Sequence, residues 1–214
     1  MSLKSFYNAV RPHLPKRWQV YNGVAVRDAA IADATDHLPE FKAGLKTAIH
    51  EGVRGGDRVI DIAAGRGVAA VWAARAGARA VTSYEASPEY VAIARQTADA
   101  AGVANVVDVE HALVGEAIDV WTDDLEGVPT IAPAALPACD VLQLDCEGAE
   151  LSILDELEQR PRSIIVESHP EFGAETDAVE ARLRRLGYDT DRLEYEPARA
   201  EKDVLVASTE RGSA

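Results

Sequence analysis

Acidic side chains and glycines recur in the sequence where short apolar stretches end. Asp61 lies inside the first such stretch, and Gly65 and Gly67 follow it in a tight loop. Glu85 closes the next apolar stretch, eighteen residues after Gly67. Glycines let a backbone approach a ligand closely, and a helix that starts there offers free N–H groups. These residues predict a nucleotide-like cofactor, with Glu85 accepting hydrogen bonds from the ribose hydroxyls.

Two cofactors fit this loop. The segment Gly65-Arg-Gly-Val-Ala-Ala70 satisfies the relaxed dinucleotide fingerprint, with alanine in the third position. A carboxylate at Asp61 would repel a pyrophosphate, but it would attract the ammonium and sulfonium groups of S-adenosylmethionine. The acidic loop therefore favours the methyl donor over NAD. A glycine turn that binds nothing is the remaining alternative.

A second acidic group, Asp145, Glu147 and Glu150, follows the fourth apolar stretch. Asp145 and Glu147 are two residues apart at a strand end, so both side chains could point the same way, and we assign both a catalytic role. Glu150 fits equally well as a favourable charge at a helix N-terminus. His169 follows the fifth apolar stretch and could take a proton from an acceptor hydroxyl, oriented by Asp145 or Glu147. His111, near the end of the third stretch, is expected to line the adenine pocket.

Carboxylates near a histidine could also hold Mg²⁺. The spacing of these residues does not require a metal, and we assign no metal ligand.

The elements that position these residues alternate between short strands and helices, which indicates an α/β fold with a parallel sheet covered on both faces. Five strands and a final pair, which forms a hairpin, are expected at residues 58–62, 80–84, 105–113, 140–144, 163–167, 188–195 and 203–207. Residues 1–38 show no clear period apart from a turn signal at Asn22-Gly23. We expect them to be an irregular N-terminal extension that serves as a lid, and residues 39–214 to form the domain.

The composition narrows the class of protein. The chain of 214 residues has a formal net charge of −14, and 47% of its residues are hydrophobic, as in a folded globular domain. Such an acidic excess argues against nucleic acid and anionic membranes as partners. It also suggests adaptation to high salt, where screening weakens self-repulsion. No signal peptide or membrane span is apparent, so we expect a cytoplasmic protein. The sequence gives no oligomeric state.

Three segments together resemble one enzyme family. They are Val59–Gly67, Tyr84–Pro88 and Leu142–Glu150, and Ala112–Gly115 follows the same pattern. They resemble the FkbM-type methyltransferases, which belong to the class I S-adenosylmethionine-dependent enzymes. Asp-x-Glu-Gly-Ala-Glu, from Asp145 to Glu150, is the specific part. The resemblance runs from about residue 55 to residue 188.

The resemblance implies a Rossmann-like three-layer sandwich with a seven-stranded, mostly parallel sheet. Its strand order would be 3-2-1-4-5-7-6, with the last strand antiparallel. It also implies that Asp61 and residues 65–67 bind the methionine part of the donor, that Glu85 binds the ribose and that Asp145 lies beside the transferring methyl group. Ala63, Ala86 and Ala112 join the cofactor site on the same basis. Ala63 departs from the family, because class I enzymes commonly have the first glycine of the loop there.

These observations predict methyl transfer from S-adenosylmethionine to a hydroxyl of a small molecule or glycan. The alternatives are an NAD-dependent oxidoreductase with a Rossmann domain and a non-catalytic cofactor-binding member of the family.

Overall fold

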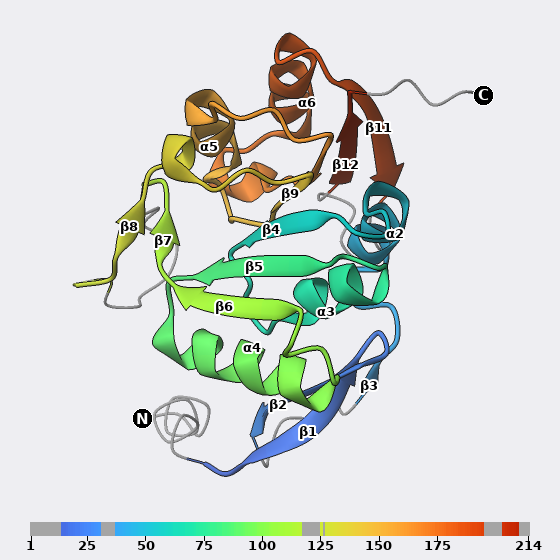
Figure 1. The fold of residues 1–214 in the computed structure, drawn as a ribbon, viewed down its shortest axis with the longest axis vertical. Coiled ribbons are helices and arrows are strands. Elements are labelled where there is room, and N and C mark those ends of the chain that lie inside the picture. Colours follow the sequence, from blue (N-terminus) through green and yellow to red (C-terminus); the bar gives the residue numbers. More distant parts are fainter. Residues whose placement is uncertain (1–13, 31–36, 117–124, 126, 195–202, 210–214) are drawn as a thin grey trace.

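The protein is built around one seven-stranded sheet, seen in a computed structural model that describes residues 14–30, 37–116, 125, 127–194 and 203–209 (Figure 1). The strands are β4 (Arg58–Ile62), β5 (Ala80–Glu85), β6 (Val107–His111), β9 (Val141–Leu144), β10 (Ser163–Glu167), β11 (Asp189–Glu194) and β12 (Asp203–Ser208). Their spatial order is β11-β12-β10-β9-β4-β5-β6. Six of the seven run in the same direction, and β12 runs antiparallel to its neighbours β10 and β11. This confirms the predicted order and the predicted antiparallel strand.

Helices cover both faces of the sheet, as the alternation of elements predicts. They are α2 (Ala43–Gly52), α3 (Val68–Arg75), α4 (Pro88–Ala100), α5 (Glu150–Glu156) and α6 (Thr176–Arg185). Successive strand residues point to opposite faces. Val59 of β4 accordingly packs in a core with α2, α3 and α4, whereas Ile60 packs in a second core with α5 and α6. No helix of the described chain is long and apolar enough to cross a membrane. The predicted three-layer sandwich is confirmed.

Smaller elements lie beside the carboxyl ends of the strands. They are β7 (Leu113–Val114), β8 (Thr130–Ile131) and the short 3-10 helices η2 (Pro133–Ala135) and η3 (Pro170–Phe172). β7 pairs with β8 in a separate two-stranded sheet. The acidic, proline-containing sequence of residues 115–137 predicts a loop or short edge elements. β8 and η2 lie in this stretch, and its residues 117–124 and 126 lie outside the described residues.

The N-terminal segment is more regular than its sequence suggests. β1 (Lys16–Tyr21) and β2 (Val24–Ala30) form an antiparallel hairpin, and β3 (His37–Leu38) adds to β1. The predicted turn joins the two long strands, with φ of 43° at Asn22 and 86° at Gly23, as a two-residue hairpin turn requires. The expectation of an irregular segment is therefore wrong. Buried and exposed residues alternate along β2, with Val24 and Val26 buried. This period of two residues is typical of a strand and differs from helical spacing.

A buried polar network attaches this hairpin to the loop after β4. Asp28 accepts hydrogen bonds from Gln19 Nε2 at 2.6 Å and Tyr21 Oη at 3.0 Å, and it forms an ion pair with Arg66. The Arg66 guanidinium also lies over the rings of Tyr21 and Tyr90. The hairpin thus contacts α4 on the outside of the fold (Figure 1). The ion pair between Asp28 and Arg66 connects it to the glycine loop.

Candidate functional site

A cavity of about 710 Å³ opens at the carboxyl ends of β4, β5, β9 and β10. This is the edge where ligands bind in open α/β sheets. Most of the predicted site residues line it: Ala63, Gly65, Glu85, Ala86, Ala112, Asp145, Glu147 and His169. Asp61, Gly67 and His111 lie nearby but are not part of its wall. No described residue before Phe41 contributes to the wall, so the lid role of the N-terminal segment stays a prediction.

The loop between β4 and α3 has three residues in the left-handed conformation. They are Ala63 with φ of 63°, Gly65 with φ of 51° and Gly67 with φ of 75°. This conformation costs a non-glycine residue about 1–2 kcal/mol. Ala63 thus adopts a backbone conformation that favours glycine, at the position where the resemblance implies a glycine.

Asp61 lies beneath this loop and is almost completely buried. Its carboxylate accepts hydrogen bonds from Ser83 Oγ at 3.0 Å and from Gln143 Nε2 at 2.6 Å. Burial raises the pKa of Asp61 to about 7, and the negative charges of Asp145 and Glu85 act in the same direction. The carboxyl of Asp61 is therefore only partly ionised near neutral pH, and it does not reach the cavity wall.

Glu85 fastens the glycine loop to the start of α4. Its Oε2 accepts a hydrogen bond from the backbone N–H of Gly65 at 2.7 Å, and its Oε1 accepts one from Ser87 at 2.8 Å. His111 contacts the same turn, because its Nε2 lies 2.9 Å from the carbonyl oxygen of Ala86. Glu85 thus lines the cavity, as expected for a residue that binds the ribose. His111 lies outside the wall and contacts it through the backbone of Ala86.

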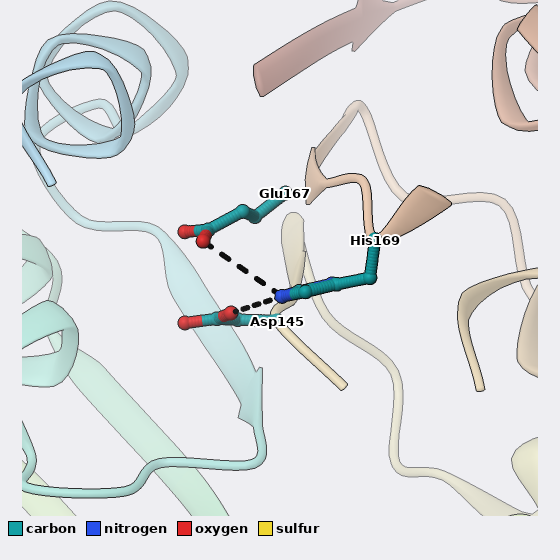
Figure 2. Close-up of side chains that lie close together, drawn as sticks. All are labelled: Asp145, Glu167 and His169. Carbon is teal, nitrogen blue, oxygen red and sulfur yellow. Dashed lines mark ion pairs between the residues drawn. The ribbon is translucent and has the colours of Figure 1, made fainter. Parts of the chain in front are cut away.

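A compact charged cluster forms the other side of the cavity, where β9 and β10 end. His169 Nε2 lies 3.5 Å from Asp145 Oδ1 and 3.8 Å from Glu167 Oε1, and Figure 2 shows the three side chains converging. Lys42 forms ion pairs with Asp145 and, at 2.9 Å, with Glu167 Oε2. Burial raises the pKa of Glu167, the Asp145 charge adds to this, and Lys42 opposes it.

The carboxylate that orients His169 is Glu150. His169 Nδ1 lies 2.7 Å from Glu150 Oε1, and both side chains are almost completely buried. Glu150 also accepts hydrogen bonds from the backbone N–H groups of Cys146 at 3.0 Å and Gly148 at 2.8 Å. Glu150 is thus an orienting carboxylate in addition to the expected Asp145 or Glu147. Glu147 lines the cavity with a left-handed φ of 52°, which turns the chain just before α5.

Lys42 is a site residue that sequence reasoning missed. It is the N-cap of α2, in a left-handed conformation with φ of 46°, and no acidic residue occupies the first turn of that helix. A cation is unfavourable at the positive end of a helix dipole. A lysine at this position is a signal in the sequence, because a nearby carboxylate is then needed to compensate its charge.

Solved structures with a similar fold include methyltransferases. The chain is 15% identical to a tRNA (uracil-54, C5)-methyltransferase from Pyrococcus abyssi in complex with S-adenosyl-L-homocysteine, with a TM-score of 0.57, covering 90% of this chain and 43% of that one. It is 17% identical to an RNA methyltransferase from Salinibacter ruber, also in complex with S-adenosyl-L-homocysteine, with a TM-score of 0.51, covering 83% of this chain and 97% of that one.

A relative is found by sequence as well. An arginine N(omega)-methyltransferase from Streptomyces achromogenes subsp. streptozoticus is 33% identical over 108 residues. These residues make up 46% of this chain and 30% of the relative, so the chain spans less than a third of that protein's length.

The names of these proteins contradict the expected partners. The similar solved structures include enzymes named for RNA and tRNA, and the relative is named for arginine. The expectation of a small-molecule or glycan acceptor, with nucleic acid excluded, is therefore wrong. It rested on a net charge that describes the whole chain, whereas an acceptor meets only the surface around one cavity.

The family comparison agrees with the motifs. The methyltransferase FkbM domain matches residues 123–190, a range that contains Asp145 to Glu150, β10 and His169. The predicted resemblance to the FkbM-type methyltransferases is thereby confirmed over this part of the chain.

Proposed function

We propose that the protein transfers a methyl group from S-adenosylmethionine. The observation that carries this proposal is the position of Glu85, whose carboxylate faces the cavity while it holds the glycine loop at Gly65. The glycine loop suits the methionine part of the donor, and the carboxylate of Glu85 at the end of β5 suits its ribose hydroxyls. The family relationship supports the donor over NAD, because the similar proteins found are methyltransferases.

Transfer requires an in-line approach of the acceptor to the sulfonium methyl group, so positioning supplies much of the acceleration. In our proposal the loop holds the methionine part and the methyl group lies beside Asp145. The acceptor then enters on the side of His169 and Phe172, which also line the cavity. The catalytic roles of Asp145, Glu147 and His169 stay predictions.

Binding of the cofactor gives the first test. Calorimetry should detect S-adenosylhomocysteine and no comparable affinity for NAD. Glu85→Gln should weaken S-adenosylhomocysteine binding about tenfold, since it removes a charged hydrogen-bond acceptor. Glu110→Gln is the matched control, because Glu110 is exposed on the neighbouring strand β6, and it should bind as the wild type does. Tight binding of NAD without S-adenosylhomocysteine would refute the proposal.

Methyl transfer gives the second test. Labelled donor should be incorporated into one of three acceptor samples, chosen from the names of the similar proteins: free arginine, total protein or total RNA. Incorporation that Glu85→Gln reduces and Glu110→Gln leaves unchanged would support the enzyme. Cofactor binding without incorporation into any sample would favour the non-catalytic alternative instead.

A cytoplasmic location and adaptation to high salt are further proposals. Both cysteines, Cys139 and Cys146, are free, which suits a reducing compartment. The net charge of −14 suits a cell interior with a high salt concentration. Raising KCl from about 0.1 M to about 2 M should raise the melting temperature, because screening weakens self-repulsion. A melting temperature indifferent to KCl would contradict the adaptation.

A further inference from the structure

We propose that Asp145, Glu167 and His169 form a binding site for a divalent metal ion of the Mn²⁺ type. One ligand atom from each residue lies within 4.8 Å of the other two (Figure 2). The two carboxylates lie at the ends of the adjacent strands β9 and β10, and the histidine follows two residues after β10. A divalent ion holds such ligands at about 2.1 Å, with neighbouring ligand atoms about 3 Å apart.

The hydrogen bond to Glu150 prepares His169 for this role. Glu150 accepts two backbone hydrogen bonds, so its carboxylate is fixed, and it faces His169 Nδ1 at 2.7 Å. A carboxylate acceptor places the imidazole proton on Nδ1 and directs Nε2 toward Asp145 and Glu167. This is the arrangement by which carboxylates orient metal-binding histidines in proteins.

Glu167 provides an independent observation. Its side chain is completely buried, and among the described residues its Oε1 has no hydrogen-bond partner. The separation of 3.8 Å between Oε1 and His169 Nε2 is too long for a hydrogen bond. A buried carboxylate oxygen without a partner is costly, and a metal ion between Oε1 and Nε2 would satisfy it.

Lys42 neutralises the same carboxylates from their other oxygen atoms. It contacts Asp145 Oδ2 and Glu167 Oε2, whereas His169 faces Oδ1 and Oε1. A metal and the ammonium can therefore share the cluster, but they repel each other across it. The ammonium group of Lys42 thus competes with the metal for the two carboxylates and lowers the affinity of the site for the metal.

The donor set selects the kind of ion. Carboxylates suit Mg²⁺ and Mn²⁺, whereas imidazole suits transition metals. Two carboxylates with one imidazole therefore favour Mn²⁺, and three protein ligands leave positions for water or for an acceptor atom. A histidine that ligates a metal through Nε2 cannot also take a proton there. Metal binding at this site and the predicted general-base role of His169 therefore exclude each other.

Titration of the protein with Mn²⁺, without cofactor, tests the site directly. Calorimetry and the loss of the free Mn²⁺ signal in electron paramagnetic resonance should show one site. Glu167→Gln and His169→Ala should each weaken binding at least about tenfold. Glu116→Gln removes a carboxylate from the same cavity but not from the cluster, and it should bind Mn²⁺ as the wild type does. Absence of a site, or equal affinity in all four proteins, would overturn the proposal.

Lys42→Met keeps all three ligands and so remains informative if the ligand variants fail to fold. It should bind Mn²⁺ about tenfold more tightly, because the competing ammonium is gone. Lys46→Met is the control: Lys46 lies on α2 and contacts Asn22 and Trp72 instead. Unchanged affinity in Lys42→Met would contradict the shared cluster. S-adenosylhomocysteine binding, measured on the same samples, reports on the proposed function separately.

Discussion

Replacing Gly67 with alanine should lower the free energy of unfolding by about 3 kcal/mol. Two costs add at this residue. Its φ of 75° is unfavourable for any side chain, and an added Cβ would lie 2.9 Å from Ala94 Cα and 3.1 Å from Ala94 O on α4. Those are backbone atoms in the middle of a helix, so they cannot move aside cheaply. Urea unfolding measures the loss.

Gly65→Ala is the matched control for this prediction. Gly65 is also left-handed, with φ of 51°, but the nearest atom to an added Cβ is Ala63 O at 4.0 Å. Only the conformational cost of about 1–2 kcal/mol should appear. Equal losses in the two variants would show that packing against α4 does not distinguish them. Both glycines would then be required only because their backbone is left-handed.

Replacing Asp61 with asparagine should stabilise the protein above pH 7. The pKa of this carboxyl is raised from 3.8 to about 7 in the folded state, chiefly by burial. Between these values the folded chain holds a proton that the unfolded chain has released, so stability falls as the pH rises. The accumulated loss reaches about 4 kcal/mol at pH 7. Asparagine does not titrate, and its Oδ1 can still accept the hydrogen bond from Gln143 Nε2 while its Nδ2 donates to Ser83 Oγ.

Thermal unfolding from about pH 4 to about pH 8 checks this prediction. The advantage of Asp61→Asn should be small at the acidic end and largest at the alkaline end. Asp99→Asn, at an exposed position near the end of α4, should show no such trend. A constant difference across the range would contradict the raised pKa. If Asp61 attracts the donor, the stabilised variant should also bind S-adenosylmethionine more weakly, a common trade-off at functional sites.

The sheet could be predicted from the sequence because its determinants are local. Short apolar runs such as 58–62 and 163–167 end at glycines or charged residues, and both match strands of the structure. A fully buried strand leaves few alternatives for such a run. The convergence of Glu85, Asp145 and His169 at one edge follows from the parallel topology, which places all carboxyl ends together.

The partnerships within the site could not be predicted in this way. Lys42 meets Asp145 across 103 positions of the chain, and no periodic pattern encodes such a contact. An acidic residue such as Glu150 is favourable at a helix N-terminus, and this local explanation gives no indication of its contact with His169. Gly67 was assigned to the cofactor from its motif, whereas its closest constraint is the backbone of Ala94. In each case the decisive neighbour lies on another element.

The ion pair between Asp28 and Arg66 bears on how this protein and its relatives diverge. Arg66 is part of the cavity wall, yet its partner lies in a hairpin outside the sheet. Loss of either charge removes the opposite charge that its buried or partly buried partner faces, so substitutions at the two positions should occur together in evolution. A relative with a different N-terminal segment should lack arginine at the equivalent loop position. The N-terminal hairpin and the cofactor loop would then be inherited as one unit.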